Sequence, residues 1–275
     1  MIFIFPLWLC GNPFLVTMNL LTVEGISKKF GARAVLQNVS FSVRRGEVLG
    51  LIGPNGAGKT TLFECLAGIL PSDGGALITN EQALAPAQRK NALFYMPDGV
   101  TPWAEQSVNW ALGFFERLYS ASVKAPDLLD ALKLESLRHA RIGSLSKGER
   151  KRLLLALGLL TPQSLLMLDE PFDGLDLRQA RDVMALLRSQ AERGRTLMLS
   201  IHQLVDAARV CDRLILLSDG RVVGEGTIDE LRAQANLSDG SPSKAGLAKA
   251  GLAKARLAKA GLAEAGLEEI FLALT

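Results

Sequence analysis

Residues 53–61 read GPNGAGKTT, which matches the pattern G-x-x-x-x-G-K-[ST]. The apolar run GEVLGLI precedes this stretch and predicts a strand, and TLFECLAGIL follows it with the character of a helix. Glycines let the backbone curl so that successive N–H groups point at phosphate oxygens, and the helix N-terminus adds partial positive charge. The sequence therefore predicts a phosphate-binding loop between a strand and a helix.

Two side chains of this loop can act on a magnesium nucleotide. Lys59 can reach the β- and γ-phosphates, and the hydroxyl of Thr60 can ligate Mg²⁺. The other candidate nucleotide ligands are Gly53, Pro54, Asn55, Gly56, Ala57, Gly58 and Thr61. We therefore expect the chain to bind a nucleotide.

A second pair of candidates lies in SLLMLDEP, residues 164–171. Four apolar residues end in Asp169 and Glu170, at the C-terminal edge of a predicted strand, where ligands bind in open α/β sheets. Asp169 would hold Mg²⁺ through its water shell, and Glu170 would polarise the attacking water. Alone, the run would be an ordinary strand that leads into a polar loop, but the upstream phosphate-binding loop favours the catalytic interpretation.

Strand-like runs alternate with longer helical ones between residues 20 and 226. The apolar runs are GEVLGLI, ALFYM, SLLMLDE, TLMLSI, RLILL and RVVGEG. This alternation predicts a parallel sheet with crossover helices. Asp176 and Gln179 predict the start of one helix, and Gly194 predicts its end. Residues 96–161 lack a strand-like run, which indicates a helical subdomain inserted into the sheet.

Composition narrows the class of protein. Of 275 residues, 48% are hydrophobic and 21% are charged, which excludes a disordered or fibrous chain. The net charge of +3 gives no reason to expect nucleic acid as the main partner. Cys10, Cys65 and Cys211 lie far apart, so neither a disulfide framework nor a structural zinc site is expected.

Residues 1–17 form an apolar leader without Lys or Arg, so they lack the charged start of a signal peptide. Pro6, Gly11 and Pro13 would break a helix before it crossed a bilayer. The leader is either a weak anchor or absent from the mature protein. We favour the second interpretation, in which it is dispensable.

Residues 237–275 form a C-terminal tail with a pentapeptide repeat, KAGLA and its variants, at residues 244–266. A period of five turns a helix by about 140° per repeat, so the leucines form no apolar stripe. Each glycine also weakens a helix by roughly 1 kcal/mol. We interpret the repeat as a linker of variable length; a basic arm that binds nucleic-acid phosphates is the alternative.

Residues 145–149, LSKGE, are consistent with two roles. Ser146 and Glu149 form a capping box for the following helix, which is a structural role. The same helix N-terminus, with Ser146 and Gly148 at its tip, could also bind an anion. Here the sequence resembles the ATP-binding subunits of ABC transporters, whose signature motif, usually LSGGQ, closes on the ATP of the partner subunit. Lys147 and Glu149 depart from that form, while the Ser and the second Gly are kept.

Three further matches carry the resemblance. Residues 174–176, Gly-Leu-Asp, match the family's D-loop. His202 follows the run TLMLSI and corresponds to the switch histidine at the γ-phosphate, although a lone histidine is usually structural. Phe30 corresponds to the aromatic side chain that stacks on adenine, although a Phe is more often part of a core.

Asp98 departs from the family pattern. The loop after the third core strand normally carries a Gln that touches Mg²⁺ and the membrane partner, and FYMPDG places Asp98 there. A carboxylate could ligate Mg²⁺ directly or through water. Asp98 is therefore a predicted nucleotide and metal ligand beside Thr60 and Asp169.

The resemblance covers about residues 20–236. It implies an α/β fold: a P-loop NTPase parallel sheet with an antiparallel β arm and an inserted helical subdomain at about residues 98–161. It implies an ATPase that uses ATP and Mg²⁺, forms a homodimer or pairs with another ATP-binding subunit, and serves an integral-membrane permease on a separate chain. Such a subunit lies peripherally on the cytoplasmic face of the inner membrane and powers transport; the closing LEEIFLALT resembles exporter-type subunits.

Two other functions are weighed against this one. Soluble ABC-type ATPases that act on nucleic acid or ribosomes usually carry tandem ATPase domains or a long coiled-coil insert, and the sequence shows neither. A non-catalytic regulatory subunit would be favoured by loss of Lys59 or Glu170, and both are present. No nucleic-acid partner is therefore expected, and the transported substrate is not readable from this chain.

Removal of two pentapeptide repeats should leave the melting temperature and the rate of ATP hydrolysis unchanged within error. The array builds no apolar face, and doubling a loop's length costs only about 0.6 kcal/mol. Calorimetry and a phosphate-release assay measure the two quantities. Neither form should bind DNA or RNA in moderate salt, and salt-sensitive binding that disappears with the repeats would support the basic arm instead.

Overall fold

Two β-sheets and the helices around them make up the fold. The structure is a computed structural model, which describes residues 19–120, 124–235 and 269–274. The predicted leader, residues 1–17, and the pentapeptide repeat, residues 244–266, lie outside the described residues.

The central sheet contains six strands, one for each of the predicted apolar runs. They are β3 (Val48–Ile52), β6 (Leu93–Met96), β7 (Leu165–Asp169), β8 (Thr196–Ile201), β9 (Arg213–Ser218) and β10 (Arg221–Gly226). Their order is β10-β9-β3-β8-β7-β6, and all neighbours are parallel except β9 and β10. The predicted parallel sheet is confirmed, and its strand ends bring the candidate ligands to one edge.

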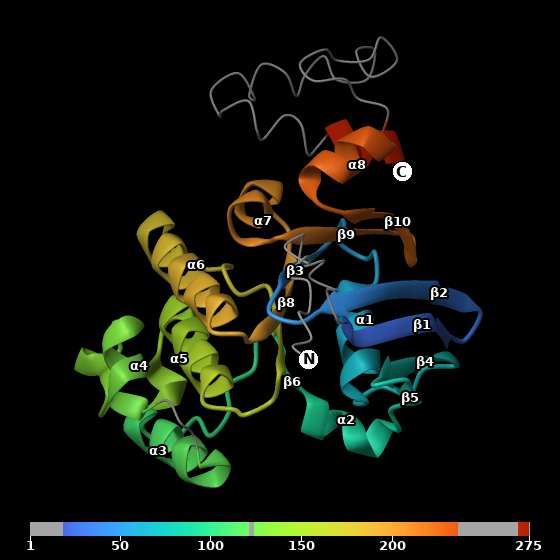
Figure 1. Ribbon diagram of the computed structural model, residues 1–275. Coiled ribbons are helices and arrows are strands. Elements are labelled where there is room, and N and C mark those ends of the chain that lie inside the picture. Colours follow the sequence, from blue (N-terminus) through green and yellow to red (C-terminus); the bar gives the residue numbers. More distant parts are fainter. Residues whose placement is uncertain (1–18, 121–123, 236–268, 275) are drawn as a thin grey trace, which may run out of the picture.

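A second, antiparallel sheet forms the predicted arm. Its strands are β1 (Asn19–Phe30), β2 (Arg33–Arg44), β4 (Gly74–Thr79) and β5 (Gln82–Ala83). Their order is β2-β1-β4-β5. The helices α1 (Lys59–Ala67) and α2 (Pro86–Ala92) belong to the same part of the chain. Figure 1 shows the arm and α1 together on one side of the central strands.

Six further α-helices lie on the other side of the central sheet or beyond its edge strand β6. They are α3 (Val108–Tyr119), α4 (Ala125–Ala131), α5 (Lys147–Leu159), α6 (Leu177–Glu192), α7 (Leu204–Val210) and α8 (Ile228–Gln234). Figure 1 shows α3, α4 and α5 grouped beyond the edge strand β6, as expected for an inserted helical subdomain. Among the described helices, none combines the length and apolar character required to cross a membrane.

Two apolar cores lie on opposite faces of the central sheet, because successive side chains of a strand point to opposite faces. In β7, Leu166 and Leu168 pack among the helices, whereas Leu165 and Met167 pack toward the arm and α1. Strand β8 follows the same alternation. Burial on both faces explains why these strands are continuous apolar runs.

The end of the C-terminal tail returns to the domain. Residues 269–274 are helical, and the side chain of Ile270 is fully buried in the core that the helices share. A Cβ atom on Gly224 of β10 would lie 3.0 Å from Leu274 Cδ1 and 2.9 Å from Leu231 Cδ2. Gly224 therefore provides the space in which this helix and α8 meet β10.

Candidate functional site

The predicted phosphate-binding loop connects β3 to α1. Gly53 approaches the backbone so closely that a Cβ atom there would lie 2.3 Å from the carbonyl oxygen of Leu217. Gly58 has φ +105°, and a Cβ atom there would lie 2.9 Å from Leu36 Cδ2. Both positions therefore require glycine. Between them, Pro54, Asn55 and Gly56 are exposed.

Lys59 begins α1 and is buried beneath this loop. Its Nζ donates hydrogen bonds to the carbonyl oxygens of Gly53, at 2.7 Å, and Pro54, at 3.2 Å. Burial lowers the pKa of the Lys59 ammonium group, and the carboxylates of Glu170 and Asp169 oppose that shift. The positive charge of Lys59 therefore lies at the base of the loop, and the carboxylates of Glu170 and Asp169 at the sheet edge compensate it.

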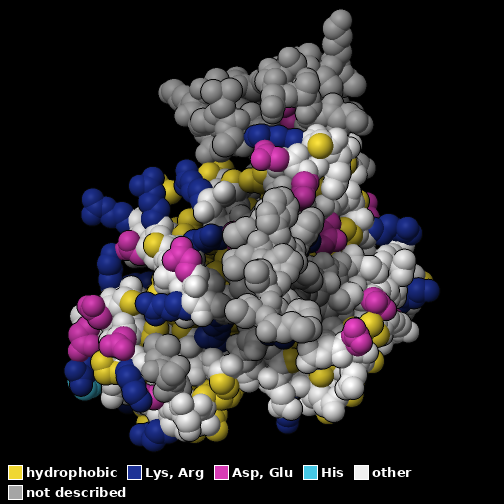
Figure 2. All heavy atoms as spheres, in the orientation of Figure 1, with side chains coloured by type: hydrophobic (Ala, Val, Ile, Leu, Met, Phe, Trp, Pro, Cys, Tyr) yellow, Lys and Arg dark blue, Asp and Glu magenta, His cyan; other side chains and the backbone are white. Residues whose placement is uncertain are grey.

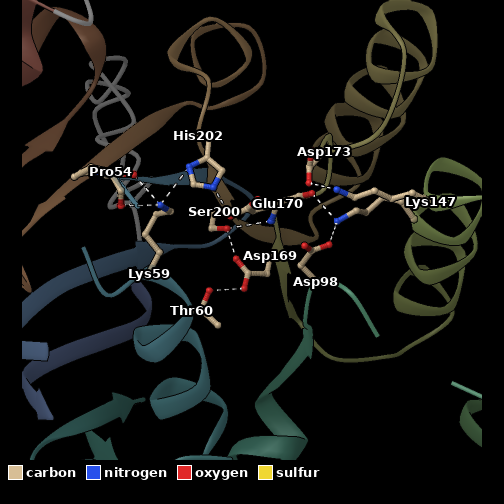
Figure 3. Close-up of polar contacts among 12 residues, drawn as sticks. Pro54, Lys59, Thr60, Asp98, Lys147, Asp169, Glu170, Asp173, Ser200 and His202 are labelled. Atoms are coloured by element: carbon tan, nitrogen blue, oxygen red, sulfur yellow. Dashed lines mark hydrogen bonds and ion pairs between the residues drawn. The ribbon is translucent and has the colours of Figure 1, made fainter. Parts of the chain in front are cut away.

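Asp169 ends β7 with a carboxylate that is almost fully buried. Its Oδ2 accepts hydrogen bonds from Thr60 Oγ1, at 2.9 Å, and from the Tyr95 hydroxyl, at 3.3 Å. Its Oδ1 accepts a hydrogen bond from Ser200 Oγ. Figure 3 shows Thr60, Asp169 and Ser200 converging at the sheet edge. Burial, followed by the neighbouring Asp169 charge, raises the pKa of Tyr95, so its hydroxyl remains a donor.

The pair Thr60 and Asp169 fits a magnesium ion chemically. A hydroxyl and a carboxylate oxygen lie next to each other, and oxygen ligands are those that Mg²⁺ prefers. The ion keeps several waters in most sites, so two protein oxygens beside the nucleotide phosphates are a sufficient set. The fit of this site to Mg²⁺ therefore rests on the two oxygen ligands, Thr60 Oγ1 and Asp169 Oδ2.

Glu170 follows Asp169 with an unusual backbone conformation, φ +49°, in the left-handed region. Its N–H donates to Ser200, whose Oγ lies at 3.0 Å and whose carbonyl oxygen lies at 3.2 Å. Its carboxylate pairs with Nε2 of His202. Nδ1 of His202 in turn lies 3.5 Å from Lys59 Nζ, which completes a chain of polar groups along the sheet edge (Figure 3).

A cleft of about 310 Å³ opens over these groups. It is lined by Arg33, Val35, Asn55, Gly56, Gly58, Lys59, Thr60, Thr61, Glu170 and His202. The structure thus brings most of the predicted loop residues together with both predicted catalytic residues. Arg33 and Val35 of β2 line the cleft without having been predicted.

Phe30 stands at the end of β1, with 51% of its surface exposed. The Nζ atom of Lys28 lies 5.5 Å from the centre of its ring, so the ring has a cationic neighbour. The cleft lining on this side comes from Arg33 and Val35 instead. Stacking of adenine on Phe30 stays a prediction.

Asp98 lies on the far side of Glu170 from the phosphate-binding loop (Figure 3). Its carboxylate pairs with Lys151 of α5, which is buried. The carboxylate oxygens of Asp98, Glu170 and Asp173 lie within 4.8 Å of one another. The role of Asp98 as a magnesium ligand stays a prediction, since its observed ion pair is with Lys151.

The predicted capping box of α5 is present. Ser146 Oγ accepts a hydrogen bond from the Glu149 N–H at 3.3 Å, and Glu149 Oε2 accepts one from the Ser146 N–H at 2.8 Å. A Cβ atom on Gly148 would lie 2.8 Å from the Gly174 carbonyl oxygen, so this glycine allows α5 to pack against the D-loop. Lys147 pairs with Asp173 at 2.6 Å. Ser146 and Gly148 are outside the lining of this chain's own cleft.

Sequence reasoning missed Tyr95, Ser200 and Lys151. Tyr95 and Ser200 carry hydroxyl groups within largely apolar strands, a pattern that could have identified them. The parallel pairing of Asp169 with Ser200 places them side by side. Lys151 sits in the basic run ERKR, which offers no signal that two of its cations, Lys151 and Arg152, are buried.

The comparisons with known proteins agree with this geometry. Residues 36–173 match the family described as ABC transporter. The chain is 35% identical to Nod factor export ATP-binding protein I of Ralstonia nicotianae, over 80% of this chain and 71% of that protein. It is 33% identical to the probable multidrug ABC transporter ATP-binding protein YbhF of Escherichia coli, over 79% of this chain and 39% of that protein.

Solved structures give the same result. An ATP-binding subunit of an ABC transporter superposes with a TM-score of 0.72 at 31% identity, covering 81% of this chain and 95% of that one. The ADP conformation of MJ1267, an ATP-binding cassette of an ABC transporter, gives 0.67 at 25% identity, covering 82% and 96%. The chain therefore belongs to the ABC transporter family, as an ATP-binding subunit that hydrolyses ATP to drive transport.

Proposed function

We propose that this subunit powers export through an integral-membrane permease on a separate chain, and that two ATP-binding subunits act as a pair. The observation that carries the paired arrangement is the separation of the two halves of the site. The cleft holds Lys59 and Glu170, whereas Ser146 and Gly148 lie outside it on α5. A second subunit could supply the missing half.

Within one cleft, each group has a role that its position supports. Lys59 and the N–H groups of residues 53–61 hold the ATP phosphates, with His202 at the γ-phosphate. Thr60 and Asp169 hold Mg²⁺, which neutralises phosphate charge when bound. Glu170 accepts the proton of the attacking water as general base. The paired His202 fixes the direction of the Glu170 carboxylate across the cleft.

Two such clefts form when the subunits face each other. Each ATP then lies between Lys59, Thr60 and Asp169 of one subunit and Ser146 and Gly148 of the partner subunit. The free N–H groups and partial positive charge of an α-helix N-terminus favour an anionic phosphate there. Hydrolysis removes the bridging γ-phosphate and allows the pair to reopen, which resets the permease.

The permease surface is proposed at the helical subdomain, residues 98–119. Large apolar side chains are exposed there: Trp103 by 41%, Trp110 by 37% and Leu118 by 57%. Trp103 contacts Trp110 edge to face, so these rings form one patch.

On the face shown in Figure 2, basic and acidic side chains are interspersed over α4 to α6, which does not favour nucleic acid as a partner. The proposed location is the cytoplasmic face of the inner membrane.

The variant Glu170→Gln should bind ATP and hydrolyse it about 10²- to 10⁴-fold more slowly, because a positioned general base contributes that factor. It should also run as an ATP-dependent dimer in gel filtration. Glu135→Gln, which changes an exposed carboxylate on a surface turn, is the matched control and should retain full activity. Turnover close to wild type in Glu170→Gln would remove Glu170 from the role of base.

The variant Ser146→Arg should abolish hydrolysis while the isolated subunit keeps its affinity for ATP, because the bulk and charge would keep the partner's phosphate away. The control is Ser107→Arg, since Ser107 caps α3 with a similar hydrogen bond, 3.2 Å from the Trp110 N–H. Each variant loses a cap worth about 1 kcal/mol. If ATP affinity of the monomer also collapsed in Ser146→Arg, Ser146 would be only a folding cap.

Affinity purification from detergent-solubilised membranes tests the partner. The tagged subunit should retain a membrane protein with several spans, and Trp110→Ala should release it while ATP hydrolysis by the isolated subunit persists. Truncating one ring of the patch removes contact area and leaves the cleft untouched. Recovery of nuclease-sensitive nucleic acid or ribosomes, with no membrane protein, would favour the soluble ATPase function.

A further inference from the structure

Lys151 is a buried cation of α5. It belongs to neither the phosphate-binding loop nor the signature motif, so neither feature explains why it is buried. Its side chain is only 9% exposed. Its Nζ pairs with the Asp98 carboxylate and donates a hydrogen bond of 2.8 Å to the carbonyl oxygen of Glu170. A buried ammonium group requires such compensation, so both contacts belong to the folded state.

The hydrogen bond from Lys151 to Glu170 matters because the Glu170 backbone is in the left-handed region. A residue with a side chain remains at φ +49° only where its surroundings hold it. Hydrogen bonds hold the peptide of Glu170 on both sides. Ser200 accepts from its N–H, and its C=O accepts from Lys151 Nζ at 2.8 Å and from the Asp173 N–H at 3.2 Å. Lys151 therefore supplies the shorter of these two hydrogen bonds to the Glu170 carbonyl group, and its donor carries a positive charge.

Asp98 fixes the position of Lys151. The lysine side chain is a flexible stem with a compact charge, so an ammonium group without a partner would sample other positions. The carboxylate of Asp98, from the loop after β6, pairs with it beside the Glu170 peptide. Three segments, α5, the end of β7 and the loop after β6, therefore meet at one ammonium group.

We propose that Lys151 is a positioning residue for ATP hydrolysis, which holds the peptide of Glu170 so that the Glu170 carboxylate stays directed at His202 and the cleft. Asp98 acts through Lys151 in this arrangement. The inference rests on the proposed role of Glu170 as general base. It assigns a function to the Asp98–Lys151 pair at the position where the family normally has Gln.

The test is the kcat of ATP hydrolysis by full-length Lys151→Met, measured with the ATP dissociation constant and the melting temperature. Loss of a charged hydrogen-bond donor should lower kcat about tenfold. Affinity for ATP should stay within twofold, because Lys59 and the loop are unchanged. Lys151→Arg, which keeps charge and donors, should recover most of the rate. Lys133→Met removes an exposed ion pair with Asp182 and should have no effect.

Lys151→Met in an Asp98→Asn background separates two causes of a lower kcat: loss of the hydrogen bond to the Glu170 carbonyl group, and an Asp98 carboxylate left without its partner. If Asp98 acts through Lys151, Asp98→Asn alone also lowers kcat, and the double variant is about as slow as Lys151→Met. If the double variant instead recovers the wild-type kcat, the loss in Lys151→Met came from the unpaired Asp98 carboxylate, and the proposal is wrong. Where Lys151→Met is not recovered folded, Lys151→Gln takes its place, with a smaller loss of kcat expected.

Unchanged kcat in the lysine variant, or parallel losses of ATP affinity and melting temperature, would overturn the proposal. Glu170→Gln is measured in the same assay. If Glu170→Gln remains active, the base role fails. If it is inactive while the lysine variant keeps the wild-type kcat, only the positioning role of Lys151 fails.

Discussion

The site depends on one buried carboxylate, that of Asp169. Its residue is 5% exposed, and a charge removed from water to that extent requires hydrogen-bond donors. The hydroxyl groups of Thr60, Tyr95 and Ser200 supply them, from α1, β6 and β8. Compensating this one carboxylate therefore ties the first turn of α1 to the strands on both sides of β7. The phosphate-binding loop sits over the sheet edge as a consequence.

Features encoded by adjacent residues were predictable from the sequence. The six strands of the central sheet correspond to the predicted runs, and the inner strands are mostly apolar because burial on both faces leaves few polar positions in them. The helix α6 begins after Asp176, which accepts from the N–H groups of Arg178 and Gln179, and it ends before Gly194 at φ +91°. Both signals act within one or two turns, so no tertiary information was needed.

Contacts between distant segments could not be predicted in this way. Tyr95 meets Asp169 from 74 positions away, and Lys151 meets Asp98 from 53 positions away. Two cations of the run ERKR, Lys151 and Arg152, are buried, and Arg150 is half-buried. This choice depends on how α5 packs, and the run itself does not encode it. The side of the cleft formed by Arg33 likewise depends on the pairing of β1 with β2 rather than on a motif.

The position of Lys151 on α5 has a consequence for how the two halves of the site communicate. Residues four apart lie on one side of an α-helix, so Lys147 and Lys151 point in the same direction. Lys147 pairs with Asp173. Lys151 pairs with Asp98 and donates a hydrogen bond to the carbonyl oxygen of Glu170. The tip of this helix carries Ser146, whose proposed ligand belongs to the opposite subunit. A hydrogen-bonded helix transmits displacement along its length. A shift of the tip on closure would therefore move the ammonium group that holds the Glu170 peptide, and we expect the proposed base to respond to the state of the interface.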